Sequence, residues 1–181
     1  MPPFIKYFFL LLLPLSAISQ DKNEELIEWD ASSKLSWADY KAKADVTTDA
    51  AAITTTYLSL EYNVNQQGFN YKIQCRFSKN RSWGIHKTAY ILSHEQGHFD
   101  IAEVYARKLH KAMSEYQFNK RTFQQDLKKI YEEIMSEKEE MQNQYDEETN
   151  HSIRKDRQAE WLKKIADLLS AYEDYADYKY L

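Results

Sequence analysis

The chain has 181 residues, a formal net charge of −4 at pH 7 and one cysteine. This length is enough for one domain with a hydrophobic core. The mild acidity argues against nucleic-acid binding, which needs a basic face, and a lone cysteine cannot form a disulfide within the chain.

Residues 1–19 have the pattern of a secretory signal peptide. Lys6 precedes the apolar run YFFLLLLPL, and small residues follow, with Ala17 and Ser19 in the places three before and one before the expected cut. The run is short and is broken by Pro14, so a retained membrane anchor is the weaker alternative. We therefore expect cleavage after Ser19, a mature chain without a membrane span, and export to the periplasm or the medium.

The first half of the mature chain carries strand patterns. A short strand or loop is expected in residues 21–50, ending in a turn of helix near Trp37. Apolar and polar residues then alternate from 58 to 64 and from 69 to 77, with the turn sequence NQQG between them. This arrangement predicts an antiparallel hairpin. Cys75 falls on the apolar side of the second strand, so we expect it to be buried.

From Thr88 onward the apolar residues recur with a helical period. Thr88 is the expected N-cap of a first helix, which ends near the sequence NKRT. Thr122, with Gln125 three residues later, has the capping-box pattern for a second helix. The sequence YDEETNHS is expected to interrupt that helix, and a third helix is expected from about Arg154. Together these patterns predict one α+β domain over residues 20–181, a small antiparallel hairpin followed by three helices.

The first predicted helix contains the string His94-Glu95-Gln96-Gly97-His98. Residues four apart on a helix lie on one face, roughly 6 Å from each other. His94 and His98 are therefore placed to bind one zinc ion (Zn²⁺). Zinc lowers the pKa of a bound water from near 16 toward about 7, and Glu95 is placed to take the proton. The string predicts a metal centre with Glu95 as the general base.

Three features around the string support this prediction. His94 and His98 share a helix stripe with apolar residues and so point inward, where an unpaired histidine is costly. A glycine inside a helix, such as Gly97, lowers helix stability by about 1 kcal/mol relative to alanine. A glycine at such an unfavourable position often marks a functional site or the close approach of another segment. The strand from 69 to 77 is a candidate edge with which an extended peptide substrate can pair.

A catalytic zinc site needs a third protein ligand, with one position left for water. We favour His151, which lies in the sequence that interrupts the second predicted helix. Asp146 is a weaker candidate as a direct ligand, but it is also placed to orient a ligand histidine. Tyr145 is placed to stabilise an oxyanion. The rival third ligands are carboxylates of the second helix, Glu133, Glu137 and Glu140.

Two stretches resemble an uncharacterised bacterial family of predicted secreted zinc-dependent proteases, a domain-of-unknown-function family with a zincin-like pattern: LSHEQGHFDIAEVYARKL and, at a distance, YDEETNHSIRKDRQAEW. The upstream LSWADYKAKAD and the pair Ser82-Trp83 resemble the N-terminal half of that family. The resemblance thus extends from Leu35 to Trp161. Ser152 departs from it, since glycine is expected there in many relatives. The resemblance implies a zincin-like fold, bound zinc and peptidase activity.

Two functions from different classes follow from these patterns. The first is a monomeric zinc metallohydrolase, most simply a peptidase acting on peptides or proteins, in which the two helix histidines and His151 bind zinc and Glu95 is the general base. The second is a catalytically inactive, zincin-like binding protein of the cell envelope, because the small chain leaves little room for a deep substrate cleft. A plain helical domain without metal is the remaining interpretation.

Overall fold

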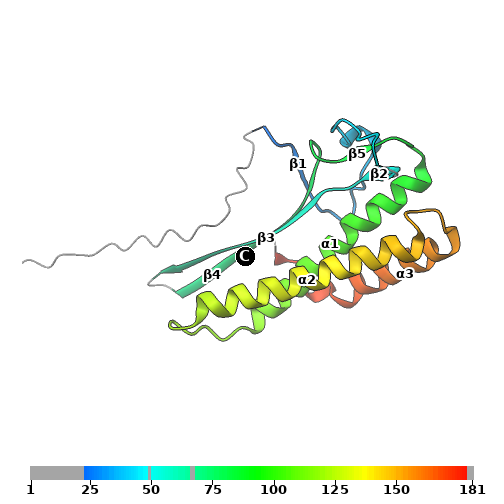
Figure 1. The fold of residues 1–181 in the computed structure, drawn as a ribbon. Helices are drawn as coiled ribbons and strands as arrows, with labels where there is room; N and C mark the ends of the chain where they lie inside the picture. The colour runs from blue at the N-terminus through cyan, green and yellow to red at the C-terminus, as the bar shows by residue number, and fades with distance from the viewer. Residues whose placement is uncertain (1–22, 49, 66–67, 179–181) are drawn as a thin grey trace, which may run out of the picture.

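The computed structural model describes residues 23–48, 50–65 and 68–178. The signal peptide predicted for residues 1–19 lies outside these ranges. Within them, no helix combines the length and the apolar character needed to span a membrane. The described chain is α+β, with two small antiparallel sheets and three α-helices (Figure 1). The predicted α+β class is therefore confirmed.

The larger sheet has three antiparallel strands in the order β1-β4-β3. They span Leu26–Glu28 (β1), Thr56–Asn65 (β3) and Gly68–Ser78 (β4). The predicted hairpin is confirmed, with Leu58 of β3 opposite Cys75 of β4. Because successive side chains of a strand point to opposite faces, one face of the hairpin is buried, and Cys75 is 1% exposed as expected.

Strand β4 lies in the centre of this sheet and not at its edge. β3 pairs with one side of β4, and β1 pairs with residues Arg76–Ser78 on the other side. Just beyond β1, the backbone N–H of Trp29 donates to the carbonyl of Cys75 at 3.1 Å. A distant three-residue strand therefore closes the predicted edge at the end of β4, from Cys75 to Ser78, and the pairing of a substrate along the rest of β4 stays a prediction.

The second sheet is a pair of short strands, Ala52–Ile53 (β2) and Trp83–Gly84 (β5). The predicted helical turn near Trp37 is present as the 3-10 helix η1 (Trp37–Asp39). The Trp37 ring lies against Gly84, where an added Cβ would come within 2.5 Å of a ring carbon. The indole N–H donates to the carbonyl of Thr88 at 3.0 Å. This contact fixes the backbone just before the first long helix.

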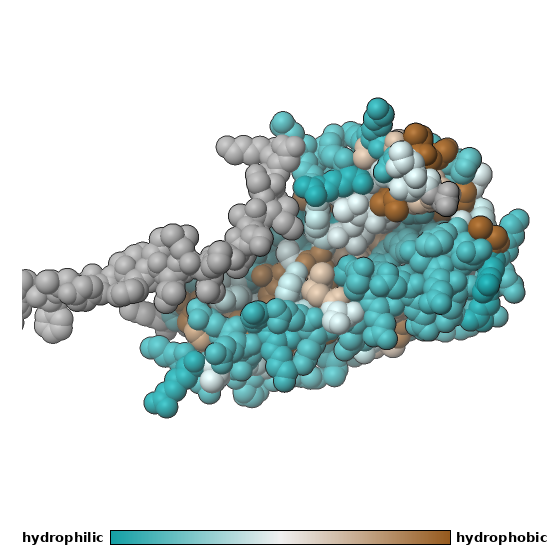
Figure 2. All heavy atoms as spheres, viewed as in Figure 1, coloured by the Kyte–Doolittle hydropathy of each residue, from teal (hydrophilic) through white to brown (hydrophobic). Residues whose placement is uncertain are grey.

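The three helices are α1 (Ala89–Glu115), α2 (Phe123–Thr149) and α3 (Lys155–Ala171). A 3-10 turn, η2 (Glu173–Tyr175), follows α3. Helix α1 contacts the larger sheet and both other helices (Figure 1). Figure 2 shows that the face over α2 is mainly hydrophilic, as expected for an amphipathic surface helix.

The helix starts agree only in part with the sequence prediction. Thr88 caps α1 as predicted, because its Oγ1 accepts a hydrogen bond from the N–H of Ile91 at 3.1 Å. Thr122 stands at the N-cap of α2, but its side chain makes no capping bond. Its hydroxyl donates to Asp126 at 2.7 Å instead. The capping box predicted with Gln125 is therefore absent from this terminus.

One hydrophobic core joins the larger sheet to the helices. Phe77 of β4 meets Phe99 of α1 with ring centroids 5.9 Å apart, and both rings are buried. On the other side of α1, Trp161 and Ile165 of α3 belong to the same core. Because α1 is packed on both sides, the direction in which its histidines point is fixed by the fold.

Candidate metal centre

Helix α1 presents two histidine rings to the same point. His94 and His98 lie one turn apart, and their Nε2 atoms are 3.2 Å from each other. The His94 side chain is 3% exposed and that of His98 is 13% exposed, so the predicted inward direction is confirmed. Two ring nitrogens brought this close need a proton or a metal cation between them, because two lone pairs or two N–H groups facing each other would repel.

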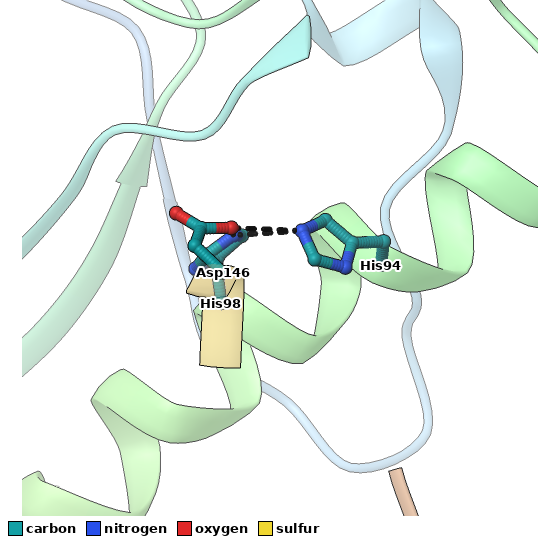
Figure 3. A group of neighbouring side chains, drawn as sticks. All are labelled: His94, His98 and Asp146. Atoms are coloured by element: carbon teal, nitrogen blue, oxygen red, sulfur yellow. Dashed lines mark hydrogen bonds and ion pairs between the residues drawn. The ribbon is translucent and has the colours of Figure 1, made fainter. Parts of the chain in front are cut away.

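A carboxylate from α2 completes the cluster. Asp146 Oδ1 lies 3.0 Å from His94 Nε2 and 3.1 Å from His98 Nε2 (Figure 3). The three atoms form a nearly equilateral triangle. A tetrahedral zinc ion with bonds of about 2.0–2.1 Å holds its ligand atoms roughly 3.3 Å apart. The triangle therefore fits three corners of a zinc site with little movement, and its two-histidine, one-carboxylate composition suits zinc.

The charges in this cluster are strongly coupled. Burial raises the pKa of Asp146, but its hydrogen bonds with the two imidazoles outweigh burial and hold that pKa well below its usual range. Burial lowers the pKa of His94, and the neighbouring His98 lowers it further. For His98, burial is outweighed by the hydrogen bond and charge of Asp146, so its pKa is raised. The cluster thus favours one positive charge beside the carboxylate, a place that a metal cation would take.

Gln142, one turn before Asp146 on α2, fixes the ring of His98. Its Oε1 lies 2.5 Å from His98 Nδ1, and its Nε2 donates to the His98 carbonyl at 2.9 Å. An amide oxygen accepts, so Nδ1 carries a proton, and in the neutral ring Nε2 then has the lone pair that a cation in the cluster would bind. This is how the outer partner of a metal-binding histidine sets its tautomer. Gln142 was not predicted from the sequence, although its spacing from Asp146 places both residues on one helix face.

Tyr145 lies beneath the cluster. Its ring stacks on that of His94, with centroids 4.4 Å apart, and its hydroxyl donates to the His94 carbonyl at 3.3 Å. The side chain is fully buried and is not among the residues that line the adjacent cavity, and burial raises the pKa of the phenol. The predicted oxyanion role of Tyr145 is therefore wrong, because its hydroxyl is held inside the core and not at the site.

The position of Tyr145 also explains Gly97. A Cβ on Gly97 would come within 2.5 Å of the Tyr145 hydroxyl oxygen and 2.9 Å of a ring carbon. The prediction that this glycine marks the close approach of another segment is confirmed. The absence of a side chain here lets α2 approach α1 closely enough for Asp146 to reach both histidines.

Replacing Gly97 with alanine is expected to lower the free energy of unfolding by about 1–2 kcal/mol. Overpacking a rigid core costs roughly 1–3 kcal/mol, which outweighs the gain of about 1 kcal/mol from helix propensity. In a Tyr145→Leu background the same substitution should be neutral or stabilising, and urea unfolding of the four proteins measures this coupling. A stabilised Gly97→Ala protein with Tyr145 intact would contradict the packing described.

Glu95 is oriented by a chain of hydroxyl groups. Its side chain is buried, and its Oε2 accepts a hydrogen bond from Thr54 Oγ1 at 2.7 Å. Thr54 Oγ1 in turn lies 2.8 Å from the Tyr40 hydroxyl, which must donate because Thr54 has only one proton to give. Neither hydroxyl was identified from the sequence. Thr54 is one of three consecutive threonines. Such a run indicates a strand, but it does not show which of the three hydroxyl groups contacts the site.

A cavity of about 400 Å³ opens onto the cluster. One wall is the segment of residues 50–56, which includes β2, and the opposite wall is one face of α2. The lining residues from the helices and the following loop are His94, Glu95, His98, Lys138, Glu139, Gln142, Asn143, Asp146, His151 and Ser152. The general-base candidate and all three members of the metal cluster thus face the same space.

His151 lies at the rim of this cavity. Its side chain is 69% exposed, and its Nδ1 is 3.5 Å from Asp146 Oδ1. The structure therefore places Asp146, and not His151, at the third corner of the triangle. The rival helix carboxylates face solvent, as the sequence analysis expected. Glu133 pairs with Lys129 and Glu137 with Lys108, while Glu140 is exposed, and none of the three lines the cavity.

Helix α2 ends later than the sequence predicted. It continues through Thr149, so Tyr145 and Asp146 are helical, and the turn that carries His151 is confined to the next few residues. Three consecutive non-glycine residues there have positive φ: Asn150 at 49°, His151 at 49° and Ser152 at 73°. The last of these explains why the resemblance leads one to expect glycine at that position.

Replacing Ser152 with glycine is expected to stabilise the fold by about 0.5–1 kcal/mol, because the left-handed conformation costs an L-residue roughly 1–2 kcal/mol. Ser136→Gly, at an exposed position inside α2, is the matched control and should destabilise by about the same amount. Thermal or urea unfolding of both variants checks the prediction. Destabilisation by both substitutions to an equal extent would show that Ser152 is not strained.

Residues 21–152 match the sequence profile of a family described as "Bacterial protein of unknown function (DUF922)". Comparison with curated proteins and with solved structures gives no match. The matched range covers more than half of the chain and contains the whole metal cluster, together with Glu95 and His151. The chain therefore belongs to the DUF922 family of bacterial proteins of unknown function.

Proposed function

We propose that this protein is an exported, zinc-dependent hydrolase, most simply a peptidase, with a zincin-like arrangement of a small sheet beside the helix that carries its histidines. The observation that carries the proposal is the triangle of His94 Nε2, His98 Nε2 and Asp146 Oδ1, with edges of 3.0–3.2 Å. A buried carboxylate, Glu95, faces the same cavity. If these four side chains served only to stabilise the fold, there would be no reason for all of them to line the same cavity.

His94, His98 and Asp146 would hold the zinc ion, and one coordination position would remain open toward the cavity. When bound, zinc supplies a Lewis acid that polarises a carbonyl oxygen and makes water more acidic. Gln142 keeps the His98 Nε2 lone pair directed at the cluster. The stacked Tyr145 ring holds the plane of His94.

Glu95 would accept the proton of the attacking water. Thr54 occupies its Oε2, and within the described residues its Oε1 has no hydrogen-bond partner. The Glu95 side chain lines a polar cavity that is large enough for water and for part of a substrate. The hydrogen bonds from Tyr40 through Thr54 fix the carboxylate in one orientation, as a general base requires.

Strand β2 would align an extended substrate. Among the described residues it pairs with β5 alone, and it lines the cavity. A peptide can therefore add to its other side by backbone hydrogen bonds, which recognise a main chain without regard to side chains. β2 thus takes the role that the sequence analysis had assigned to β4. This arrangement favours a peptide over other amides as the substrate class.

The proposal is tested with the purified mature chain. Metal analysis should find one zinc per chain, and a fluorescently labelled, unfolded protein should be cleaved by it. A strong chelator should abolish cleavage, and added zinc should restore it. A protein that binds no zinc, or cleavage that the chelator does not affect, would contradict the proposal. Bound zinc without any cleavage would favour the alternative of an inactive binding protein of the cell envelope.

A further inference from the structure

Lys138 lies on the same face of α2 as two residues of the metal centre. It precedes Gln142 by four residues and Asp146 by eight, and all three line the cavity. With a helix rise of 1.5 Å per residue, its Cα is about 12 Å from that of Asp146 along the axis. Lys138 thus contributes to the cavity wall at some distance from the cluster, on the side where a bound substrate would extend.

Lys138 differs from the other lysines of α2 because its side chain is largely covered and yet its ammonium has no partner among the described residues. Its exposure is 7%, and its ammonium makes no hydrogen bond or ion pair with any described residue. Lys128 and Lys129 of the same helix are exposed and pair with glutamates one turn further on. Lysine side chains are seldom covered to this extent, and the Lys138 ammonium nitrogen is not among the fully buried polar atoms that lack a partner, so its charge is accessible from the cavity.

The acidic residues of the cavity do not neutralise this charge. Glu95 accepts a hydrogen bond from Thr54, and Asp146 is engaged by the two histidines. Glu139 is exposed and follows Lys138 directly, so the two side chains leave the helix in different directions. Among the described residues that line the cavity, Lys138 is the only lysine or arginine. The cavity therefore offers one unneutralised cation to whatever enters it.

We propose that Lys138 binds a carboxylate of the substrate, so that the enzyme selects peptides with a negative charge within about four residues of the cleaved bond. An extended chain advances about 3.3 Å per residue, which matches the separation of Lys138 from Asp146 along α2. The carboxylate belongs either to the C-terminus of the peptide or to an aspartate or glutamate side chain. This inference rests on the proposed peptidase function, which supplies the substrate.

Binding is measured separately from turnover. Four short peptides, each labelled with fluorescein at the N-terminus, combine a free or amidated C-terminus with glutamate or glutamine near that end. Their affinity for the zinc-loaded Glu95→Gln protein is measured by fluorescence polarisation. A peptide with a carboxylate at the preferred place should bind about 10- to 100-fold more tightly than the amidated glutamine peptide, as expected for a hydrogen bond between charged groups. Comparison within the set identifies whether the terminus or the side chain supplies that carboxylate.

Substitution at Lys138 supplies the decisive comparison. Lys138→Met keeps the apolar stem and should abolish the preference, Lys138→Arg should retain most of it, and Lys128→Met on the exposed face should leave it unchanged. In the active protein, Lys138→Met should raise KM for carboxylate-bearing peptides with little change in kcat. Equal binding of all four peptides, binding of none, or a preference that survives in Lys138→Met overturns the proposal. If the protein still cleaves peptides in a zinc-dependent way, any of these results would reject the role of Lys138 but not the peptidase function.

Discussion

Glu95→Gln is expected to lower kcat for peptide cleavage by about 10²–10⁴-fold, the usual contribution of a general base. The amide has the size of the carboxylate, and its oxygen can still accept the hydrogen bond from Thr54, but it cannot take a proton from water. Because Glu95 is not one of the zinc ligands, the variant should bind one zinc per chain as the wild type does. Steady-state kinetics and metal analysis on the same preparation measure both quantities.

The matched control for this substitution is Glu139→Gln. Glu139 also lines the cavity, but it is exposed and makes no contact with the metal cluster. Its substitution should leave kcat within a few-fold of the wild type. Full activity of Glu95→Gln would remove Glu95 from the mechanism, and loss of zinc from that variant would mean that Glu95 acts as a ligand.

Asp146→Asn is expected to weaken zinc binding by at least about 100-fold, more than the 10- to 100-fold typical of residues outside the ligand set. The substitution removes the negative charge that both imidazoles face, and a neutral amide is a poor zinc ligand. His151→Ala should change the affinity by less than about 10-fold, because the imidazole stands at the exposed rim. Competition with a chromophoric chelator gives both affinities.

The same pair of variants decides between the two candidate third ligands. Loss of affinity in His151→Ala, with Asp146→Asn near the wild type, would restore the ligand set predicted from the sequence. His86→Ala serves as a control, since His86 is an exposed histidine outside the cavity lining. Circular dichroism of each metal-free protein shows whether a loss of affinity reflects a loss of fold.

The parts of the fold that depend on local periodicity were predictable. The hairpin follows from strict alternation around Cys75, and α1 follows from its helical stripe and from the cap at Thr88. Strand β1 was not predictable as a partner of β4, because a three-residue segment carries no period and its pairing spans some fifty residues. For that reason the sequence did not show that the end of the second hairpin strand is paired on both sides. The end of α2 was placed too early because tertiary packing of Tyr145 outweighs the polar character of YDEETN.

In the candidate site, too, the residues related by local spacing were predictable, and those brought together by the fold were not. His94, Glu95 and His98 share one helix turn, so their spacing alone brought them together. Asp146 and His151 both lie near the end of α2, and only the helical path to Thr149 shows which of them faces the histidines. Thr54 has no signature of its own in the sequence, and Gln142 and Lys138 are marked only by their four- and eight-residue spacing from Asp146 on α2. Gly97 is the exception, since a glycine inside a helix indicated a close contact that the structure then identified as Tyr145.

The central claim is that zinc is bound between α1 and α2 by two histidines and one aspartate. Anomalous diffraction at the zinc edge, on crystals of the mature chain prepared with zinc, tests it most directly. We expect one strong peak about 2.0–2.2 Å from His94 Nε2, His98 Nε2 and a carboxylate oxygen of Asp146. A zinc peak elsewhere, or no peak at this cluster in crystals that contain zinc, would contradict it.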